Sequence, residues 1–221
     1  MILYFDTETT GTNSFNHEIL QIAGLVEVNG KIVEKFEFKS RPLKLSTIEP
    51  EALAVNGLNM DDILRYPDPS ETFVKLMKIF EKYVDSRKKD KTSEDKFYPA
   101  GQNIDFDVKF LRSFFYQNNN KFFGAYFNYD YVDLRMMMSS LKAWGLVDLK
   151  DLKLSTIADF FFPGKKFDAH NAVADIEMTR DCILKYKEIY VNQQAVRNVI
   201  TGQSDERPKT DKRKLVGKAK R

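Results

Sequence analysis

Ile2-Leu3-Tyr4-Phe5-Asp6-Thr7-Glu8 is a short apolar run that ends in two acidic residues. A continuous apolar run of this length is typical of a strand that is buried on both faces. Side chains two positions apart on a strand point to the same face, so Asp6 and Glu8 would lie side by side. Carboxylates that close repel each other, and a divalent cation with oxygen ligands would offset the repulsion. An acidic pair of this kind is weak evidence for a metal site when it stands alone.

The segments that follow predict a sheet with helices. Residues 19–28 and 31–38 are strand-like, and Asn29-Gly30 between them is a strong hairpin signal. With the first run they form an antiparallel meander of three strands. Two more strand-like segments, 97–100 and 131–134, alternate with segments of helical spacing at 49–55, 59–64, 70–87, 105–117, 135–142, 155–161 and 171–190. This order predicts an α/β fold, with a mixed five-stranded sheet and helices on both faces.

The composition is that of a globular protein of 221 residues, with 43% hydrophobic and 13% aromatic residues. The single cysteine, Cys182, has no internal disulfide partner, and no group of Cys and His has zinc-binding spacing. The chain has neither an apolar run long enough for a membrane span nor the basic and apolar regions of a signal peptide. We therefore expect a reducing, cytoplasmic setting and no membrane partner.

The positive net charge comes from the C-terminal segment. Residues 197–221 hold nine Lys and Arg against three Asp and Glu, a local charge of +6, which leaves −3 for the rest of a chain whose net charge is +3. We expect a folded domain over residues 1–196 and a basic, disordered tail over residues 197–221. The tail is either a solvated charge run or a phosphate-binding extension, and phosphate binding would be salt-sensitive.

Further acidic residues follow the fourth strand-like segment and open the last helix. Asp105 and Asp107 stand where a strand hands over to a helix, an end of the sheet that commonly lies over a ligand-binding crevice. Asp105 also suits helix capping, so its position alone leaves both aspartates as candidates. His170 and Asp175 stand at the start of the last predicted helix. A single histidine is more often a surface or core residue than a functional one.

Three motifs agree in order and spacing: FDTETTG at residues 5–11, NIDFD at 103–107 and HNAVAD at 170–175. Together they resemble the motifs of the DEDDh, or DnaQ-like, 3′-to-5′ exonucleases, a family that includes the proofreading epsilon subunit of bacterial DNA polymerase III. The resemblance covers about residues 1–190. One departure is Gln102-Asn103, where many relatives carry His-Asn; this position is not catalytic in the family and would affect only the fit around the terminal nucleotide.

The resemblance implies an RNase H-like fold and a two-metal nuclease. It implies that two divalent cations, Mg²⁺ or Mn²⁺, are held by four carboxylates, those of Asp6, Glu8, Asp107 and Asp175. It thereby favours Asp107 over Asp105. It also implies that His170 is the general base, a role that suits an imidazole. The substrate would be nucleic acid with a free 3′ end, and the products nucleoside 5′-monophosphates.

The same resemblance suggests which residues lie beside the terminal nucleotide. We expect the backbone of Thr7, Thr9 and Thr10 to position it, with Ile104 or Phe106 near the base or sugar. For Phe106, core packing with other phenylalanines on its helix face is the stronger expectation. For Ile104, packing and binding are equally supported.

Several functions are compatible with these residues. Single-stranded DNA is the favoured substrate, in proofreading or repair, either alone or beside a polymerase. An exoribonuclease would use the same carboxylates, and only contacts to the 2′-hydroxyl would distinguish it. A non-catalytic nucleic-acid or polymerase-binding module usually loses a ligand, whereas all five positions are present here. Of the residues outside the motifs, we expect His17 to be solvated and Trp144 to anchor a turn against the core.

Overall fold

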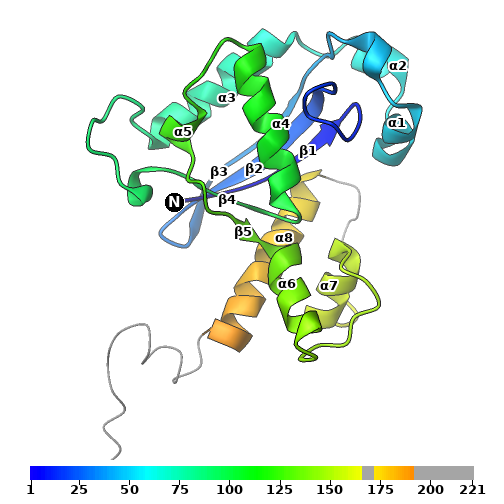
Figure 1. Cartoon of the computed structure of the whole chain (residues 1–221), viewed down its shortest axis with the longest axis vertical. Helices are drawn as coiled ribbons and strands as arrows, with labels where there is room; N and C mark the ends of the chain where they lie inside the picture. Colours follow the sequence, from blue (N-terminus) through cyan, green and yellow to red (C-terminus); the bar gives the residue numbers. More distant parts are fainter. Residues whose placement is uncertain (166–171, 192–221) are drawn as a thin grey trace, which may run out of the picture. The chain divides into compact units, whose positions relative to one another are not determined.

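The computed structural model describes residues 1–165 and 172–191, and the chain divides into two units, Met1–Ile183 and Leu184–Arg221. The first unit is built on a five-stranded sheet with the order β3-β2-β1-β4-β5 (Figure 1). The strands are β1 (Ile2–Thr9), β2 (Ile19–Val28), β3 (Lys31–Lys39), β4 (Tyr98–Gly101) and β5 (Val132–Asp133). β1 pairs antiparallel with β2 and parallel with β4, so the predicted mixed α/β sheet is confirmed.

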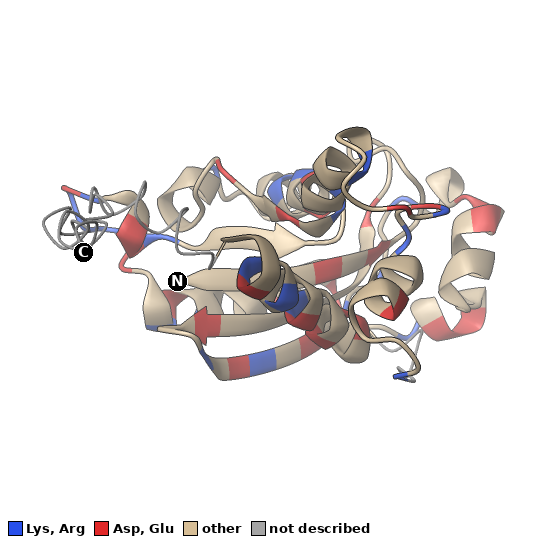
Figure 2. Cartoon of the chain, turned by 90° about the horizontal axis from the view of Figure 1, so that it is seen from below, with Lys and Arg blue, Asp and Glu red and all other residues tan. Residues whose placement is uncertain are grey.

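The hairpin between β2 and β3 forms where the Asn-Gly signal predicts it. Val28 pairs with Lys31, and Asn29 and Gly30 adopt φ angles of 51° and 77°. These left-handed values are those that a two-residue hairpin turn needs, and Asn and Gly accept them readily. β3 is an outer strand of the sheet and carries both acidic and basic residues along its length (Figure 2). Charges on an outer strand disfavour pairing with a further strand.

The longest helices in the described part of the chain are α3, α4 and α8. All the α-helices found there are α1 (Pro50–Asn56), α2 (Met60–Ile63), α3 (Pro69–Tyr83), α4 (Ile104–Gln117), α5 (Phe123–Tyr126), α6 (Leu134–Ala143), α7 (Leu154–Phe161) and α8 (Ala172–Tyr186), with 3-10 turns at Leu45–Thr47 and Ser93–Asp95 and a π-helical turn at Lys187–Val191. α3 begins at Pro69 because the carboxylate of Asp68 accepts a hydrogen bond from the backbone N–H of Ser70. No helix in the described part of the chain is long and apolar enough to cross a membrane.

α3 and α4 cover one face of the sheet. Leu3 and Phe5 of β1 share a core cluster with Phe73 of α3 and with Phe110 and Phe115 of α4. α4 crosses this face in Figure 1. The aromatic rings interlock edge to face, with centroids 5.1 Å apart for Phe73 and Phe115. This packing fixes the orientation of α4, whose first turn carries Asp107.

α8 lies on the opposite face. Arg180 of α8 donates to Glu27 of β2 over 2.6 Å, and Glu177 pairs with Lys35 of β3. Ile176, Met178 and Cys182 are buried. Burial raises the pKa of the Cys182 thiol to about 12. The side chains of Tyr4, Asp6 and Glu8 alternate with those of Leu3 and Phe5 and therefore point to the α8 side of the sheet.

Candidate active site

The carboxylates of Asp6 and Glu8 lie near the carboxyl end of β1. The strand continues through both residues to Thr9, with Asp6 paired to Ala23 and Glu8 to Gln21 of β2. The register shifts between Glu8 and Thr9, an irregularity that bends the end of the strand. β1 is held on one side by β2 and on the other by β4, so the two carboxylates stand on a rigid strand in the middle of the sheet.

Asp107 reaches the same region from the other face of the sheet. It is buried in the first turn of α4, and its Oδ1 accepts two hydrogen bonds from Thr7, one from the backbone N–H at 2.9 Å and one from the hydroxyl at 2.7 Å. Thr7 stands between Asp6 and Glu8 in the sequence and points to the α4 side. Asp105, the competing candidate, is exposed and pairs with Lys109 one turn along the helix.

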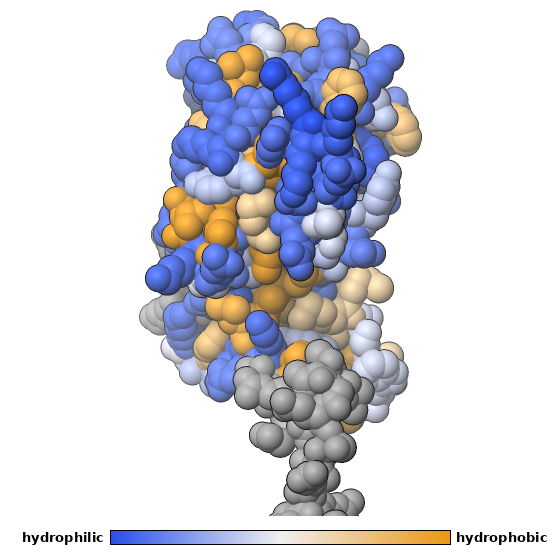
Figure 3. All heavy atoms as spheres, turned by 90° about the vertical axis from the view of Figure 1, so that its left-hand side faces the viewer, coloured by the Kyte–Doolittle hydropathy of each residue, from blue (hydrophilic) through white to orange (hydrophobic). Residues whose placement is uncertain are grey.

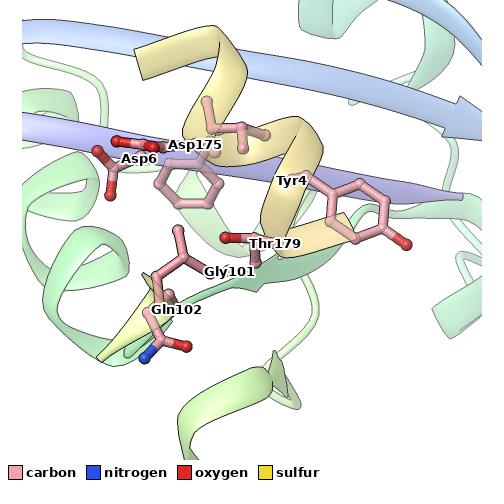
Figure 4. A pocket seen from close by; sticks show the side chains of 9 residues that line it. Tyr4, Asp6, Gly101, Gln102, Asp175 and Thr179 are labelled. Atoms are coloured by element: carbon pink, nitrogen blue, oxygen red, sulfur yellow. The ribbon is translucent and has the colours of Figure 1, made fainter. Parts of the chain in front are cut away.

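Asp175 approaches from the first turn of α8. It lines a pocket of about 210 Å³ with Asp6, Tyr4 and Thr179. Figure 4 shows the carboxylates of Asp6 and Asp175 side by side at one end of this pocket, with Tyr4 toward the other end. Three segments that are far apart in the sequence therefore bring acidic side chains to the carboxyl end of β1.

The electrostatics of the site follow from this convergence. Burial, together with the charges of Glu8 and Asp175, raises the pKa of Asp6 to about 7. Burial and the charge of Asp6 also raise the pKa of Asp107 well above its usual range, against the lowering effect of the hydrogen bonds from Thr7. The charge of Asp6 therefore interacts with the charges of Glu8, Asp107 and Asp175. A carboxylate cluster with this property is stabilised by a cation at its centre.

The donor set fits a hard divalent cation, because carboxylate oxygens are the ligands that Mg²⁺ and Mn²⁺ prefer. Within residues 1–165 and 172–191, no group of three or more His, Cys, Asp or Glu side chains lies close enough together to hold a metal ion. The hydrogen bonds from Thr7 hold one oxygen of Asp107 and leave its geometry well defined. His170, the expected general base, lies outside the described residues.

Several of the groups expected beside the terminal nucleotide make hydrogen bonds or packing contacts within the protein. The N–H of Thr7 donates to Asp107 and that of Thr10 to the carbonyl of Glu18, while the hydroxyl of Thr9 donates to the carbonyl of Gly11. Ile104 is fully buried in the core cluster, so its side chain presents no surface to a nucleotide. Phe106 packs against Phe110, with ring centroids 4.8 Å apart, as the packing interpretation predicts.

The loop after β1 contains two buried polar residues whose role the sequence did not reveal. His17 was expected to be solvated, but its ring is buried against Gly11, where a Cβ would come within 2.4 Å of it. Its Nδ1 accepts from the N–H of Asn13, and its Nε2 lies 3.5 Å from Glu49 Oε1. The Glu18 carboxylate accepts from the N–H groups of Leu43 and Lys44 and from the amide of Gln117.

These contacts fix the loop at the edge of the site. The N–H of Glu49 donates to the carbonyl of Thr10, and the amide of Asn56 donates to that of Thr9, so α1 is tied to the end of β1. The sequence gives no signal that His17 is buried, because Glu49, one of the residues beside its ring, is far away in the sequence. Trp144, expected to anchor a turn, is 71% exposed, which corrects that expectation.

Several solved structures of exonuclease I have the same fold. Structures of exonuclease I align with this chain at TM-scores of 0.66 and 0.65 and at 19% identity, and they include the E. coli enzyme in complex with a dT13 oligonucleotide. The alignments cover 92% and 90% of this chain but 44% and 43% of those chains. A moderately thermophilic exonuclease I from Methylocaldum szegediense aligns at a TM-score of 0.65, 18% identity, over 91% of this chain and 42% of its own.

The sheet and its covering helices define an RNase H-like α/β fold. The family model and a curated relative identify the chain as a protein of the DnaQ-like type. The chain belongs to the RNase_T exonuclease family, whose model matches residues 3–183. A curated relative, the DNA polymerase III PolC-type protein of Caldanaerobacter subterraneus subsp. tengcongensis, is 27% identical over 185 residues. That alignment covers 83% of this chain and 11% of the relative, so the chain spans a small part of the relative's length.

Proposed function

We propose that this protein is a divalent-metal-dependent 3′-to-5′ exonuclease of the DEDDh type, which releases nucleoside 5′-monophosphates. The observation that carries the proposal is the convergence of Asp6, Asp107 and Asp175 at the carboxyl end of β1, where burial, Glu8 and Asp175 raise the pKa of Asp6. A buried carboxylate with a raised pKa costs stability when it is ionised without a cation, and carboxylates with perturbed pKa values gather at functional sites. Membership of the exonuclease family supports the same conclusion.

Each residue of the site has a distinct proposed role. Asp6, Glu8, Asp107 and Asp175 would hold the cations, and Thr7 orients Asp107 through two hydrogen bonds. Divalent cations bound there would stabilise the charge on the leaving 3′ oxygen and favour deprotonation of the attacking water. The imidazole of His170 accepts the proton of that water. Mg²⁺ is the proposed physiological ion, and Mn²⁺ its substitute.

We expect His170→Ala to lower turnover by about two to four orders of magnitude, which is the usual contribution of a positioned general base. Binding of Mn²⁺ in calorimetry should be nearly unchanged, because the four carboxylates are intact. Rates measured with a labelled oligonucleotide check the first expectation. Full activity of this variant would remove His170 from the mechanism.

Single-stranded DNA is the proposed substrate, and a cytoplasmic setting beside a polymerase is the proposed context. Solved exonuclease I structures with dT13 and dA16 oligonucleotides support the first point, and the PolC-type relative supports the second. The fold does not exclude RNA, since the same carboxylates serve both sugars. The choice between the two depends on how the terminal sugar is contacted.

The test is a time course on 5′-labelled single-stranded DNA and on RNA of the same sequence, with Mg²⁺, Mn²⁺ or EDTA. We expect a metal-dependent ladder that shortens from the 3′ end, faster on DNA than on RNA. A matched pair of variants, Asp6→Ala and Asp105→Ala, separates a catalytic carboxylate from an exposed one. Faster shortening of RNA than of DNA would reassign the substrate. Cleavage of neither substrate by the wild-type protein would favour a binding module.

A further inference from the structure

The pocket that Asp6 and Asp175 line extends well beyond these two carboxylates. Its volume is about 210 Å³, which is room for several water molecules, since each takes about 30 Å³ in the liquid. The pocket lies between the sheet and the first half of α8, and Leu154 of α7 also lines it. The proposed metal ligands account for only one end of this space.

The wall of the pocket differs from the apolar areas of the protein surface. Figure 3 shows hydrophobic side chains gathered in the lower middle of the face on the side of α5, with hydrophilic side chains above them. Such areas suit a partner that buries apolar surface. The pocket instead combines the apolar side chains of Leu154 and Ile176 with carboxylate, hydroxyl and amide groups. A cavity that is both polar and roomy is one in which water becomes ordered.

Thr179 brings a hydroxyl to the pocket one helical turn after Asp175. Residues four apart on a helix lie on the same face, with Cβ atoms about 5–6 Å apart. The threonine is 4% exposed, and Figure 4 shows its hydroxyl pointing into the pocket. This spacing suits a water molecule that bonds to the hydroxyl on one side and donates to a carboxylate on the other.

Gln102 adds a buried acceptor to the same wall. Its Nε2 donates to the carbonyl of Leu152 over 2.7 Å, which holds the amide in place. Its Oε1 is buried, and no donor reaches it in the described part of the chain. A buried carbonyl oxygen without a hydrogen bond costs free energy. Because this oxygen and the carboxylates of Asp6 and Asp175 are all acceptors, a molecule with two donors, such as water, suits the space among them.

Water is itself a substrate of the proposed reaction. Each hydrolysis forms a bond from the water oxygen to phosphorus and breaks the bond from phosphorus to the leaving 3′ oxygen. The base takes one proton of the water, and the leaving oxygen is protonated in turn. Asp175 lies on α8, and the proposed base, His170, precedes α8 in the sequence. A supply of water on the α8 side of the sheet therefore serves the reaction.

We propose that this pocket holds ordered water molecules, which bridge the Thr179 hydroxyl to the carboxylates of Asp6 and Asp175 and supply the attacking water. Thr179 is then a positioning residue, because it acts through water and does not touch the substrate. This inference rests on the proposed exonuclease function and deepens it. The hydroxyl of Thr179, and not its shape, is what the reaction needs.

The kinetic test replaces Thr179 by valine, which has the same shape but no hydroxyl. We expect Thr179→Val to lower kcat on a labelled single-stranded oligonucleotide by about tenfold, the usual effect of losing one hydrogen bond to a charged group. KM and the Mn²⁺ affinity measured by calorimetry should be unchanged, because no proposed ligand is altered. Thr179→Ser should restore most of kcat. An unchanged kcat in the valine variant, or failure of the serine rescue, would overturn the role of Thr179.

Cys182→Ala is the matched control, since Cys182 is a buried residue of the same helix that does not line the pocket. This variant should lower the melting temperature, because it leaves a small cavity, and keep the wild-type kcat at a temperature where the protein is folded. A fall in kcat as large as that of Thr179→Val would show that loosening of α8, and not loss of a water contact, is the cause.

A high-resolution crystal structure of the metal-free wild-type protein tests the pocket directly. We expect ordered water within hydrogen-bond distance of the Thr179 hydroxyl and of Gln102 Oε1, and loss of the first in Thr179→Val. A pocket without ordered water, or one filled by a base in an oligonucleotide complex, would overturn the proposal. Absence of cleavage by the wild-type protein would instead overturn the exonuclease proposal, and the water positions would still decide whether the pocket binds water.

Discussion

The carboxylate of Asp6 couples the stability of the protein to pH. Its pKa is about 7 in the folded chain, above the value of an exposed aspartate, because burial and the charges of Glu8 and Asp175 disfavour ionisation. A raised folded pKa means that the folded state holds the proton more tightly than the unfolded state. In the metal-free protein, the contribution of Asp6 to the free energy of unfolding is therefore fully present below about pH 4 and is lost as the pH rises from there to about 7.

We expect Asp6→Asn to stabilise the metal-free protein at pH 8, because an amide of the same shape removes the buried charge. The melting temperature in EDTA should rise by roughly 3–10 °C, and the gain should shrink at pH 5. Differential scanning fluorimetry at both pH values checks this. Asp105→Asn is the matched control, since Asp105 is exposed on the same helix as Asp107. An equal gain at pH 5 and pH 8 would show that charge is not the cause.

Thr7 holds Asp107 with both its N–H and its hydroxyl. Thr7→Val keeps the shape and the backbone bond but removes the hydroxyl donor. Outer-shell partners of metal ligands typically contribute 10- to 100-fold, so we expect exonuclease turnover and Mn²⁺ affinity to fall by about tenfold. Unfolding in urea should show a loss of about 1 kcal/mol. Thr7→Ser should restore most of the activity, and failure of this rescue would argue for a packing effect.

At the scale of single residues, the motifs located the acidic side chains. The burial of other residues near the site depends on contacts between segments that are far apart in the sequence. Asp6 and Glu8 follow from strand alternation, whereas only the family resemblance favoured Asp107 over Asp105 and gave Asp175 a role. The burial of His17 depends on Gly11 and Glu49, and the burial of Ile104 depends on the core between α4 and the sheet. Sequence spacing carries no information about such contacts.

Among the elements, α8 presents Asp175, and an ion pair fixes it to the sheet. Arg180 and Glu27 are 15% and 7% exposed, and the same pair influences Tyr4, whose pKa is raised by burial and by Glu27. Arg180→Met leaves the Glu27 carboxylate buried without its cation. We expect a loss of about 3 kcal/mol in urea unfolding, with reduced turnover because Asp175 shares the helix.

The exposed pair of Lys35 and Glu177 is the control, since it also joins α8 to the sheet. Lys35→Ala should cost less than about 1 kcal/mol, as surface pairs do. Combining Arg180→Met with Glu27→Gln should recover part of the lost stability, because no unpaired charge is left. Equal costs for Arg180→Met and Lys35→Ala would contradict a buried role for Glu27.

The ends of the elements differ from the expectations for local reasons. β1 extends beyond the apolar run to Thr9 because β2 supplies pairing partners for its acidic residues. α3 ends at Tyr83 rather than near Arg87, because Val84 is extended and the carboxylate of Asp85 accepts from the N–H of Arg87. α5 was not predicted, since its four residues are too few for a helical period to be recognised.

For the whole molecule, the predicted order of strands and helices was sufficient for the α/β fold. The alternation of segments limits the topology, although it does not give the sheet order or the side on which α8 lies. The boundary expected at residue 196 stays a prediction, as residues 192–221 lie outside the described part of the chain. The family model ends at residue 183.

We expect removal of the basic residues 197–221 to weaken binding of the whole protein to single-stranded DNA, mainly at low salt. The segment contributes a charge of +6, and phosphate contacts are lost steeply as salt rises. The effect is measured by comparing the affinity of the 221-residue protein and of residues 1–196 for labelled single-stranded DNA, by anisotropy, at about 50 mM and about 200 mM salt. Identical salt slopes for the two proteins would mean that the segment does not contact phosphates.

The central claim is that the carboxylates at the end of β1 form one metal-binding centre. Calorimetric titration with Mn²⁺ of the wild type, Asp6→Asn and Asp105→Asn tests it most directly. We predict binding by the wild type, a loss of at least tenfold in affinity in Asp6→Asn, and unchanged affinity in Asp105→Asn. No binding by the wild type, or equal losses in the two variants, would contradict the claim.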